Sequence, residues 1–271
     1  SLEQRIDAAT RELRLSNAQL QRLDEAKDEF ISMASHQLRT PLTSIKGYIS
    51  MMLEGDVGSV TPQQKHVLQE AFIGSERMVR LIGDFLNVSR LQTGKFIIEK
   101  RPTDIAELID DELDSLEPNA SARGLKFKYS HPRKTPVLNV DANKIQQVIM
   151  NFADNAIYYS KENSVIKISL KVNKDWLEYT VVDSGIGVPE DEQSRLFKKF
   201  FRATNARKQR PDGTGVGLFL AKKVIDAHEG EIIFESKENK GSTFGFRLPI
   251  KSLRVDNTEQ LKEQPSDNNN D

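Results

Sequence analysis

The first 29 residues contain neither glycine nor proline, which restricts the start of the chain to one long helix. Glutamate, arginine, glutamine, alanine and leucine, all good helix formers, make up most of this segment. Apolar residues recur at alternating steps of three and four, as along a coiled-coil seam: Leu2, Ile6, Ala9, Leu13, Leu20, Leu23, Phe30 and Ala34. Ser16 and Lys27 fill the two remaining seam positions. Because the stripe is narrow and continuous, we expect a dimer seam; a single helix packed on its own domain is the alternative.

The stretch ASHQLRTPL continues this helix, and the same register places its histidine on the exposed side. With Ala34 on the seam, His36 lies about 200° around the helix and points toward solvent. Pro41 lacks a backbone donor and is expected to bend the helix just after the histidine. Thr40 lies one turn from His36 on the same face. A histidine retained for packing would not be exposed, so we interpret His36 as a candidate for chemistry.

A second helix is expected after a short break. Apolar residues resume at Leu42, so the first helix continues to about Leu53, and GDVGSVTP then ends it. Thr61 is the expected N-cap and Pro62 the first residue of a helix that reaches about Leu91. Two helices alone are too thin to bury their apolar faces, and dimerisation into a four-helix bundle would bury them.

From about residue 96 the pattern changes to an α+β sandwich. The segment VIKISLKV alternates apolar residues with lysine and serine, which predicts a half-buried strand. Other expected strands are LKFKYS, TPVLNV, WLEYTVVD, EIIFES and STFGFRLP. Expected helices are TDIAELIDDELDSLEPNASARG, opened by Thr103 or Asp104, residues 141–160, and LFLAKKVIDAH. Interspersed helices and alternating strands predict a sheet with one face covered and one face wet. The tail from residue 253 has too little apolar surface to fold, so we expect disorder there.

Composition excludes several classes of protein. With 39 Lys+Arg against 40 Asp+Glu, the formal net charge is −1, and no global basic field draws the chain to nucleic acid or to an anionic membrane. The absence of cysteine excludes disulfides, thiolate catalysis and cysteine-bound zinc. No apolar run approaches the roughly 20 residues that cross a bilayer, so we expect no membrane segment and a cytoplasmic location for this chain. Because the chain begins with Ser1, we expect it to be a fragment without its sensory part.

Asparagine and glycine motifs follow one another through the second domain. Asn151 and Asn155 lie four residues apart on one helix face and offer oxygens that Mg²⁺ accepts beside nucleotide phosphates. DSGIG follows a predicted strand, and GTGVGL opens a predicted helix, where a phosphate group would find backbone donors. Neither a dinucleotide fingerprint nor a P-loop is present. Each glycine group alone would fit a tight turn, but their ordered series makes chance a poor explanation.

The motifs ASHQLRTPL, NFADNA, DSGIG, LFKKFFR, GTGVGL and GSTF together resemble a sensor histidine kinase of a two-component system. The resemblance covers roughly residues 27–249. It implies a histidine-phosphotransfer dimerisation domain joined to a Bergerat-type ATP-binding domain. The expected boundaries are a coiled-coil linker at 1–29, the dimerisation domain at 30–95, the ATP-binding domain at 96–252 and the tail at 253–271. It also implies autophosphorylation of His36 from Mg-ATP, followed by transfer to an aspartate of a response regulator.

The resemblance assigns roles to individual residues. Asp183 would accept the adenine amine, Asn155 would ligate Mg²⁺, and Asn151 would support the phosphate side. Arg202 and the basic lid would neutralise charge on the transferring phosphoryl group; a solvated basic loop is the alternative for the lid residues Arg207, Lys208 and Arg210. The glycines would permit close backbone approach and lid movement: Gly185, Gly187, Gly213, Gly215 and Gly217. Leu218 and Thr243, from GTGVGL and GSTF, complete the expected nucleotide contacts. Thr40 matches the position that orients a hydrolytic water in members with phosphatase activity, or it bonds its own helix backbone.

Two positions depart from the family pattern. Gln37 stands where the family usually has a carboxylate, and its amide cannot take a proton from the imidazole, although it accepts a hydrogen bond. The expected result is a working but slower kinase. Tyr158 stands where the family commonly has a lysine near the phosphates. Lys161, one turn further on, is either the substitute for it or a surface lysine.

Two other readings remain open. Gln37 and Tyr158 support a catalytically weakened dimeric scaffold that binds ATP and a regulator. A chaperone, topoisomerase or mismatch-repair ATPase would fit the second domain, but it would leave ASHQLRTPL without a purpose.

Overall fold

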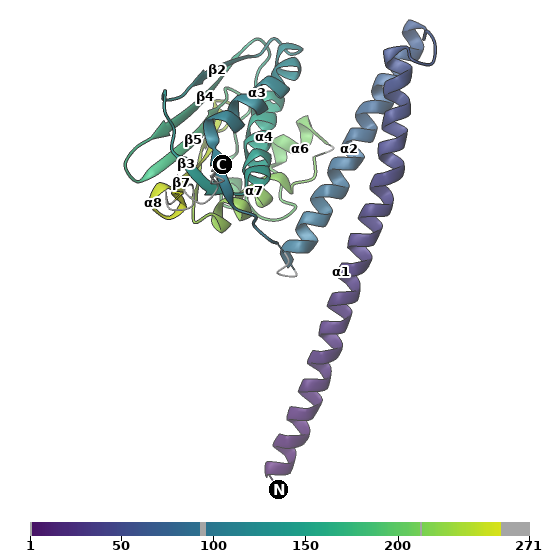
Figure 1. Cartoon of the computed structure of the whole chain (residues 1–271), viewed down its shortest axis with the longest axis vertical. Coiled ribbons are helices and arrows are strands. Elements are labelled where there is room, and N and C mark those ends of the chain that lie inside the picture. The colour runs from purple at the N-terminus through teal and green to yellow at the C-terminus, as the bar shows by residue number, and fades with distance from the viewer. Residues whose placement is uncertain (1, 93–95, 212, 256–271) are drawn as a thin grey trace, which may run out of the picture. The chain divides into compact units, whose positions relative to one another are not determined.

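The computed structural model describes residues 2–92, 96–211 and 213–255, and it divides into two compact units, Ser1–Ile97 and Ile98–Asp271 (Figure 1). The first unit is a helical hairpin, and the second combines helices with a sheet. The predicted order of an all-α hairpin followed by an α+β sandwich is confirmed. No helix among these residues is both long and apolar enough to cross a bilayer.

The hairpin consists of α1 (Leu2–Glu54) and α2 (Pro62–Gln92). α1 continues through Pro41, as predicted. A reciprocal capping box begins α2: the Thr61 backbone donates to Gln64 Oε1 at 2.9 Å, and the Gln64 backbone donates to Thr61 Oγ1 at 3.3 Å. The predicted start of the second helix at Pro62 is therefore confirmed, with its physical cause.

A single hairpin buries little apolar surface. Leu42, Leu86 and Val88 are buried, but many large side chains remain exposed. The exposed ones include Leu13, Leu20, Leu23, Phe30, Leu38, Ile45, Met52, Met78, Leu81 and Phe85. Soluble proteins rarely leave so many large apolar side chains exposed on one element pair, which agrees with the predicted bundle of two hairpins.

The second unit contains seven strands and six helices among its described residues. In chain order these are β1 (Arg101–Asp104), α3 (Ile105–Ser121), β2 (Lys126–Ser130), β3 (Val137–Val140), α4 (Ala142–Tyr159), β4 (Val165–Val172), β5 (Trp176–Val182), α5 (Glu190–Gln193), α6 (Thr204–Gln209), α7 (Gly217–Ala227), β6 (Glu231–Lys237), β7 (Gly241–Pro249) and α8 (Ile250–Leu253).

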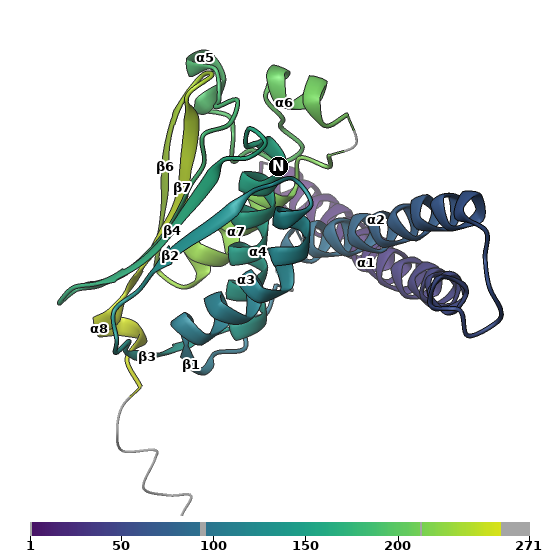
Figure 2. The same cartoon turned by 90° about the horizontal axis from the view of Figure 1, so that it is seen from above.

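Five strands form one mixed sheet in the order β2-β4-β5-β7-β6, and β1 pairs with β3. β2 is parallel to β4, and the other neighbours in the large sheet are antiparallel. α3, α4 and α7 cover one face of this sheet (Figure 2). On β4, Ile166, Ile168 and Leu170 are buried, whereas Lys167 and Lys171 are exposed. The predicted sheet with one covered face and one wet face is confirmed.

The core lies between the helices and the covered face of the sheet. Phe152 from α4, Tyr179 from β5 and Phe246 from β7 are among its largest fully buried side chains. The Tyr179 and Phe246 ring centroids lie 5.2 Å apart on neighbouring strands. This packing fixes α4 on the sheet, and α4 carries both asparagines of the candidate site.

The structure contains elements that the sequence did not predict, namely β1 and the short helices α5, α6 and α8, and it orders the first residues of the expected tail. β1 was not predicted, because RPTD is short, contains proline and pairs with β3 over 30 residues later. Asp104, one of the two predicted caps, is the N-cap of α3 and accepts from the Ala106 backbone at 2.9 Å. The first residues of the predicted disordered tail are ordered, since Leu253 is buried and Arg254 bridges to Leu138. Residues 256–271 lie outside the described part.

Candidate functional site

α4 is anchored at its N-terminus by Asp141 and His228. The Asp141 carboxylate accepts from the Lys144 backbone at 3.1 Å and from the Glu99 backbone at 3.0 Å. The Asp141 backbone donates to His228 Nε2 at 2.9 Å, and His228 Nδ1 lies 2.7 Å from the Val224 carbonyl oxygen. His228 is therefore the neutral Nδ1–H tautomer, and burial lowers its pKa. This contact ties the start of α4 to the end of α7.

Asn151 and Asn155 lie one turn apart on α4, and both side chains are half-buried. Asn151 Nδ2 donates to the Gly217 carbonyl at 3.4 Å, which places the first turn of α7 beside the asparagines. Among the residues that the structure describes, the Asn155 side chain has no hydrogen-bond partner. Its amide oxygen is thus available to a ligand.

Asp183 directly follows β5 and is buried, with 8% of its surface exposed. Its Oδ1 accepts from the Gly185 backbone at 2.7 Å. Burial raises the pKa of the Asp183 carboxyl to about 6, opposed by backbone hydrogen bonds from Gly185 and Ser242. The group is charged at neutral pH, and a buried carboxylate is costly without a donor. Thr243 on β7 pairs with Val182, the residue before Asp183, and so lies close to Asp183.

Two glycines explain how the loops come so close to the strands and helices. A Cβ at Gly185 would lie 2.2 Å from the Tyr159 carbonyl oxygen, so only glycine brings the loop after Asp183 against the end of α4. Gly215 has φ +69°, and a Cβ there would lie 2.8 Å from the Phe200 carbonyl carbon. Gly187, Gly213 and Gly217 flank these two positions in DSGIG and GTGVGL.

The N-terminus of α7 faces the asparagines and suits a phosphate group. Thr214 Oγ1 accepts from the Val216 backbone at 3.2 Å, which shapes the loop before the helix. The first-turn backbone N–H groups, including that of Leu218, have no partner within the helix, and the helix dipole favours an anion there. Leu218 is half-buried in this turn.

Arg202 organises the lid in this structure. Its guanidinium donates to the carbonyl oxygens of Ala206 at 3.2 Å, of Pro211 at 3.1 Å and of Arg210. These carbonyls lie in α6 and just after it, so Arg202 closes the C-terminal end of that short helix. Its predicted role at the phosphoryl group stays a prediction. Arg207 and Lys208 are exposed on the same segment.

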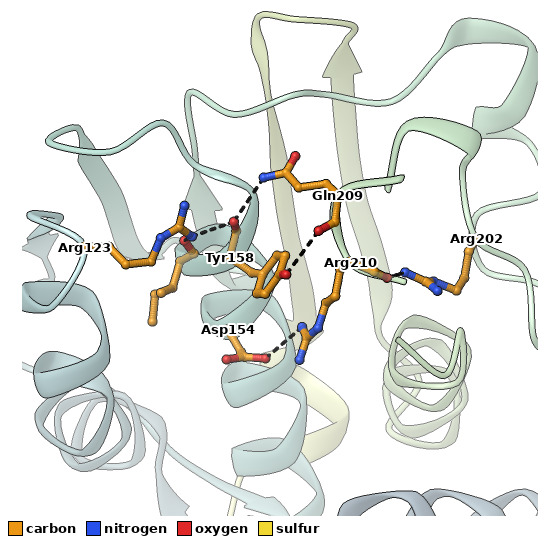
Figure 3. Close-up of polar contacts among 7 residues, drawn as sticks. Arg123, Asp154, Tyr158, Arg202, Gln209 and Arg210 are labelled. Atoms are coloured by element: carbon orange, nitrogen blue, oxygen red, sulfur yellow. Dashed lines mark hydrogen bonds and ion pairs between the residues drawn. The ribbon is translucent and has the colours of Figure 1, made fainter. Parts of the chain in front are cut away.

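Tyr158 reaches the lid. Its hydroxyl donates to the Gln209 carbonyl oxygen at 3.2 Å, and the Arg210 guanidinium lies 4.5 Å from the ring centroid. Arg210 also pairs with Asp154 at 3.4 Å (Figure 3). Lys161, the candidate substitute for a phosphate-binding lysine, has an exposed side chain. No local sequence signal links Asp154 or Tyr158 to Gln209 and Arg210, so sequence reasoning missed these contacts.

In the hairpin unit, His36 and Gln37 are exposed on α1, whereas Ser35 beside them is buried. Thr40 Oγ1 donates to the His36 carbonyl oxygen at 3.2 Å, which is the backbone-bonded alternative for this threonine. The exposed imidazole is open to a partner group. The role of Thr40 in dephosphorylation stays a prediction.

Both units match known family models. Residues 26–94 match the model described as His Kinase A (phospho-acceptor) domain. Residues 140–252 match the model described as Histidine kinase-, DNA gyrase B-, and HSP90-like ATPase. The first match contains His36, and the second contains Asn151, Asn155 and Asp183.

Curated relatives are similar over most of the chain. The Circadian input-output histidine kinase CikA of Synechococcus elongatus is 30% identical over 99% of this chain and 35% of its own length. The Sensor histidine kinase WalK of Bacillus subtilis is 32% identical over 89% of this chain and 39% of its own length. The chain thus spans little more than a third of these relatives. The structure of full-length ShkA in complex with AMPPNP has the same fold, with a TM-score of 0.66 and 22% identity over 84% of this chain and 46% of that one.

Proposed function

This chain belongs to the sensor histidine kinases, and on that premise we propose that it transfers the γ-phosphoryl group of Mg-ATP to His36 and then to an aspartate of a response regulator. The observation that carries the proposal is the exposed imidazole of His36 within the phospho-acceptor match. Its exposure lets two different partners reach it in turn, first the ATP-binding domain and then the receiver.

The second unit, an ATP-binding domain of this family, offers a complementary group for each part of ATP. The buried carboxylate of Asp183 would accept the adenine amine, whereas guanine presents an acceptor there and would be repelled. The first turn of α7 would bind phosphate oxygens.

The residues present also fit Mg²⁺. The unpartnered amide oxygen of Asn155 is the ligand this chain would offer, and the described residues hold no cluster of three or more histidine, cysteine, aspartate or glutamate side chains for a metal. The remaining ligands would be phosphate oxygens and water, as is usual for Mg²⁺. When bound, the ion neutralises charge on the phosphates.

The chemistry at His36 needs no prior deprotonation, because neutral imidazole attacks with a ring lone pair. An N–P bond forms, the bond from the γ-phosphorus to the bridging oxygen breaks, and ADP leaves. The second ring nitrogen then carries a proton. The side-chain oxygen of Gln37 would accept a hydrogen bond from this N–H group but would not remove the proton. We therefore expect phosphorylation to be slower than it would be beside a carboxylate.

Partners and location follow from the same proposal. The phospho-acceptor domain implies a homodimer, and the exposed apolar side chains of the hairpin support it. The receiver domain would bind around His36. Because ATP is a cytoplasmic substrate, we place this part of the protein in the cytoplasm.

A catalytically weakened scaffold is the second candidate. It is favoured by the structure of the lid, where Arg202 contacts backbone carbonyls and Arg210 contacts Asp154 and Tyr158. These cations are engaged in contacts within the chain.

Labelling with γ-labelled ATP and Mg²⁺ separates the two candidates. The wild-type chain should acquire a label that is labile in acid and stable in base, and His36→Ala should acquire none. The control variant His66→Ala changes an exposed histidine of α2 and should label normally. ATP binding without any label in the wild-type chain would favour the scaffold.

A further inference from the structure

The ring of Tyr158 lies next to two arginines at the C-terminal end of α4 (Figure 3). The Arg210 guanidinium is 4.5 Å from the ring centroid, and that of Arg123 is 5.8 Å from it. Arg123 comes from the turn after α3, whereas Arg210 belongs to the lid segment. The tyrosine thus joins a fixed part of the fold to the lid.

Two consecutive lid residues converge on one turn of α4. The Tyr158 hydroxyl donates to the Gln209 carbonyl oxygen at 3.2 Å, and Gln209 Nε2 donates to the Tyr158 carbonyl oxygen at 3.4 Å. Arg210 adds an ion pair with Asp154, which lies one turn before Tyr158. Every one of these contacts must break if the lid leaves α4.

Arginine side chains brace the backbone on both sides of the contact. Arg123 donates to the carbonyl oxygens of Tyr158 at 2.5 Å, of Ser160 at 3.2 Å and of Ile157, and so closes the end of α4. Arg202 gathers the carbonyl oxygens at the end of α6 in the same way. If the lid moves as one piece, only a few contacts determine whether it lies against α4. Tyr158 makes one of these contacts.

The position of Tyr158 relates this contact to the nucleotide. Tyr158 follows Asn155 by three residues on α4, so the two are neighbours on the helix surface. An ordinary surface contact is the alternative, and a second ring–guanidinium pair in this unit offers a comparison. The Arg247 guanidinium lies 5.8 Å from the centroid of the Trp176 ring. Trp176 is the first residue of β5, whereas Asp183 follows the last residue of that strand.

We propose that Tyr158 is a positioning residue that latches the lid onto α4 and thereby slows the departure of bound nucleotide. The latch rests on the proposed function, because it acts on the nucleotide of the ATP-binding domain. Ring and hydroxyl both contribute. A ring–guanidinium contact and a hydrogen bond of this kind together shift a two-state lid equilibrium by about tenfold, equivalent to about 1.4 kcal/mol.

Limited trypsin digestion without nucleotide tests the latch directly. Arg207 and Lys208 are exposed in the lid, and the bond after Arg210 resists trypsin because Pro211 follows. Cleavage after Arg207 and Lys208 should be about tenfold faster in Tyr158→Ala than in the wild-type chain. Tyr158→Phe keeps the ring and should fall between the two. Trp176→Ala is the matched control and should be cut at the wild-type rate.

The pairing with Arg210 has its own test. Arg210→Ala should also accelerate cleavage, and the double variant Tyr158→Ala/Arg210→Ala should be cut less than the product of the two effects predicts. Independent effects would overturn the latch. So would a wild-type rate in Tyr158→Ala, or equal acceleration in Trp176→Ala.

Release of a fluorescent ADP analogue completes the experiment. Dissociation measured by stopped flow should be about five- to tenfold faster from Tyr158→Ala, and unchanged dissociation despite faster cleavage would overturn the proposal. If the wild-type chain fails to bind the analogue, the proposed function fails, whereas the digestion without nucleotide still reports on the lid.

Discussion

Burial of the Asp183 carboxyl group favours ligand binding and opposes folding. Its burial raises the carboxyl pKa from its ordinary value to about 6, so the charged form is destabilised in the folded chain. At pH 7 this corresponds to about 2–3 kcal/mol of lost stability. A donor from the ligand offsets the cost, which is the behaviour expected of a recognition group.

The variant Asp183→Asn should therefore bind ATP about 10–100-fold more weakly, because an amide presents the wrong groups to the adenine edge. In the absence of nucleotide it should be more stable at pH 7, by up to about 2 kcal/mol. Titration with a fluorescent ATP analogue and urea unfolding measure the two effects. Asp191→Asn, an exposed aspartate on α5, is the control. Unchanged ATP affinity in Asp183→Asn would remove this residue from the site.

The sign of the pH dependence follows from the raised pKa. Between the unfolded and folded values the native state binds more protons, so the contribution of Asp183 to stability increases as the pH falls through about 6. If Asp183 has its proposed role, nucleotide binding should change in the opposite direction, because the adenine amine would need the ionised carboxylate.

At the scale of elements, α4 is held at both ends by residues distant in sequence. His228 joins its N-terminus to α7, and Arg123 closes its C-terminus. The periodicity of apolar residues predicted α4 and most other elements, because periodicity is local. The contacts at the two ends, the strand β1 and the lid contacts of Tyr158 join residues far apart in sequence, and no local pattern encodes them.

The contact of His228 makes the second unit sensitive to acid. Its pKa is lowered in the folded chain, mainly by burial, so below about pH 6.5 the unfolded state binds more protons. The contribution of His228 is present above that pH and is lost as the pH falls. In His228→Gln the stability lost between pH 7.5 and 5.5 should be smaller than in the wild-type chain, by up to about 1 kcal/mol in urea unfolding.

Asp183 changes the stability with the opposite sign in the same pH range. Comparing the slope of stability against pH between His228→Gln and the wild-type chain isolates the effect of His228. The exposed His131, at the end of β2, provides the control His131→Gln. Equal slopes for His228→Gln and the wild-type chain would contradict the assignment of a buried neutral imidazole.

At the scale of the whole molecule, the two units differ in how completely they bury their apolar side chains. The second unit buries a full core between its sheet and three helices, whereas one hairpin leaves large apolar side chains exposed. The proposed acceptor, His36, thus lies on the unit that most needs a second copy. The sequence predicted this division through the change from a heptad pattern to alternating strands, but the heptad stripe alone did not specify which side chains of α2 stay uncovered.

Phe85, on α2, tests the need for a second copy. It is 53% exposed in the single chain, and burying a phenylalanine contributes about 1.5–3 kcal/mol. A two-fold interface would count each substitution twice, and about half of each side chain is left to bury, so Phe85→Glu should weaken the dimer by about 1.5–3 kcal/mol, or about 10–100-fold in the dissociation constant. Analytical ultracentrifugation over a dilution series measures this constant. Gln69→Glu adds the same charge at an exposed polar position of α2 and should leave the dimer intact.

The same variant connects assembly to chemistry. Labelling of His36 in Phe85→Glu should decline at protein concentrations where the wild-type chain is still dimeric, and it should recover when concentration restores the dimer. A variant that stays dimeric throughout the dilution series would show that Phe85 lies outside the interface. A monomeric variant that labels at the wild-type rate would show that one hairpin and its own ATP-binding domain suffice for phosphorylation.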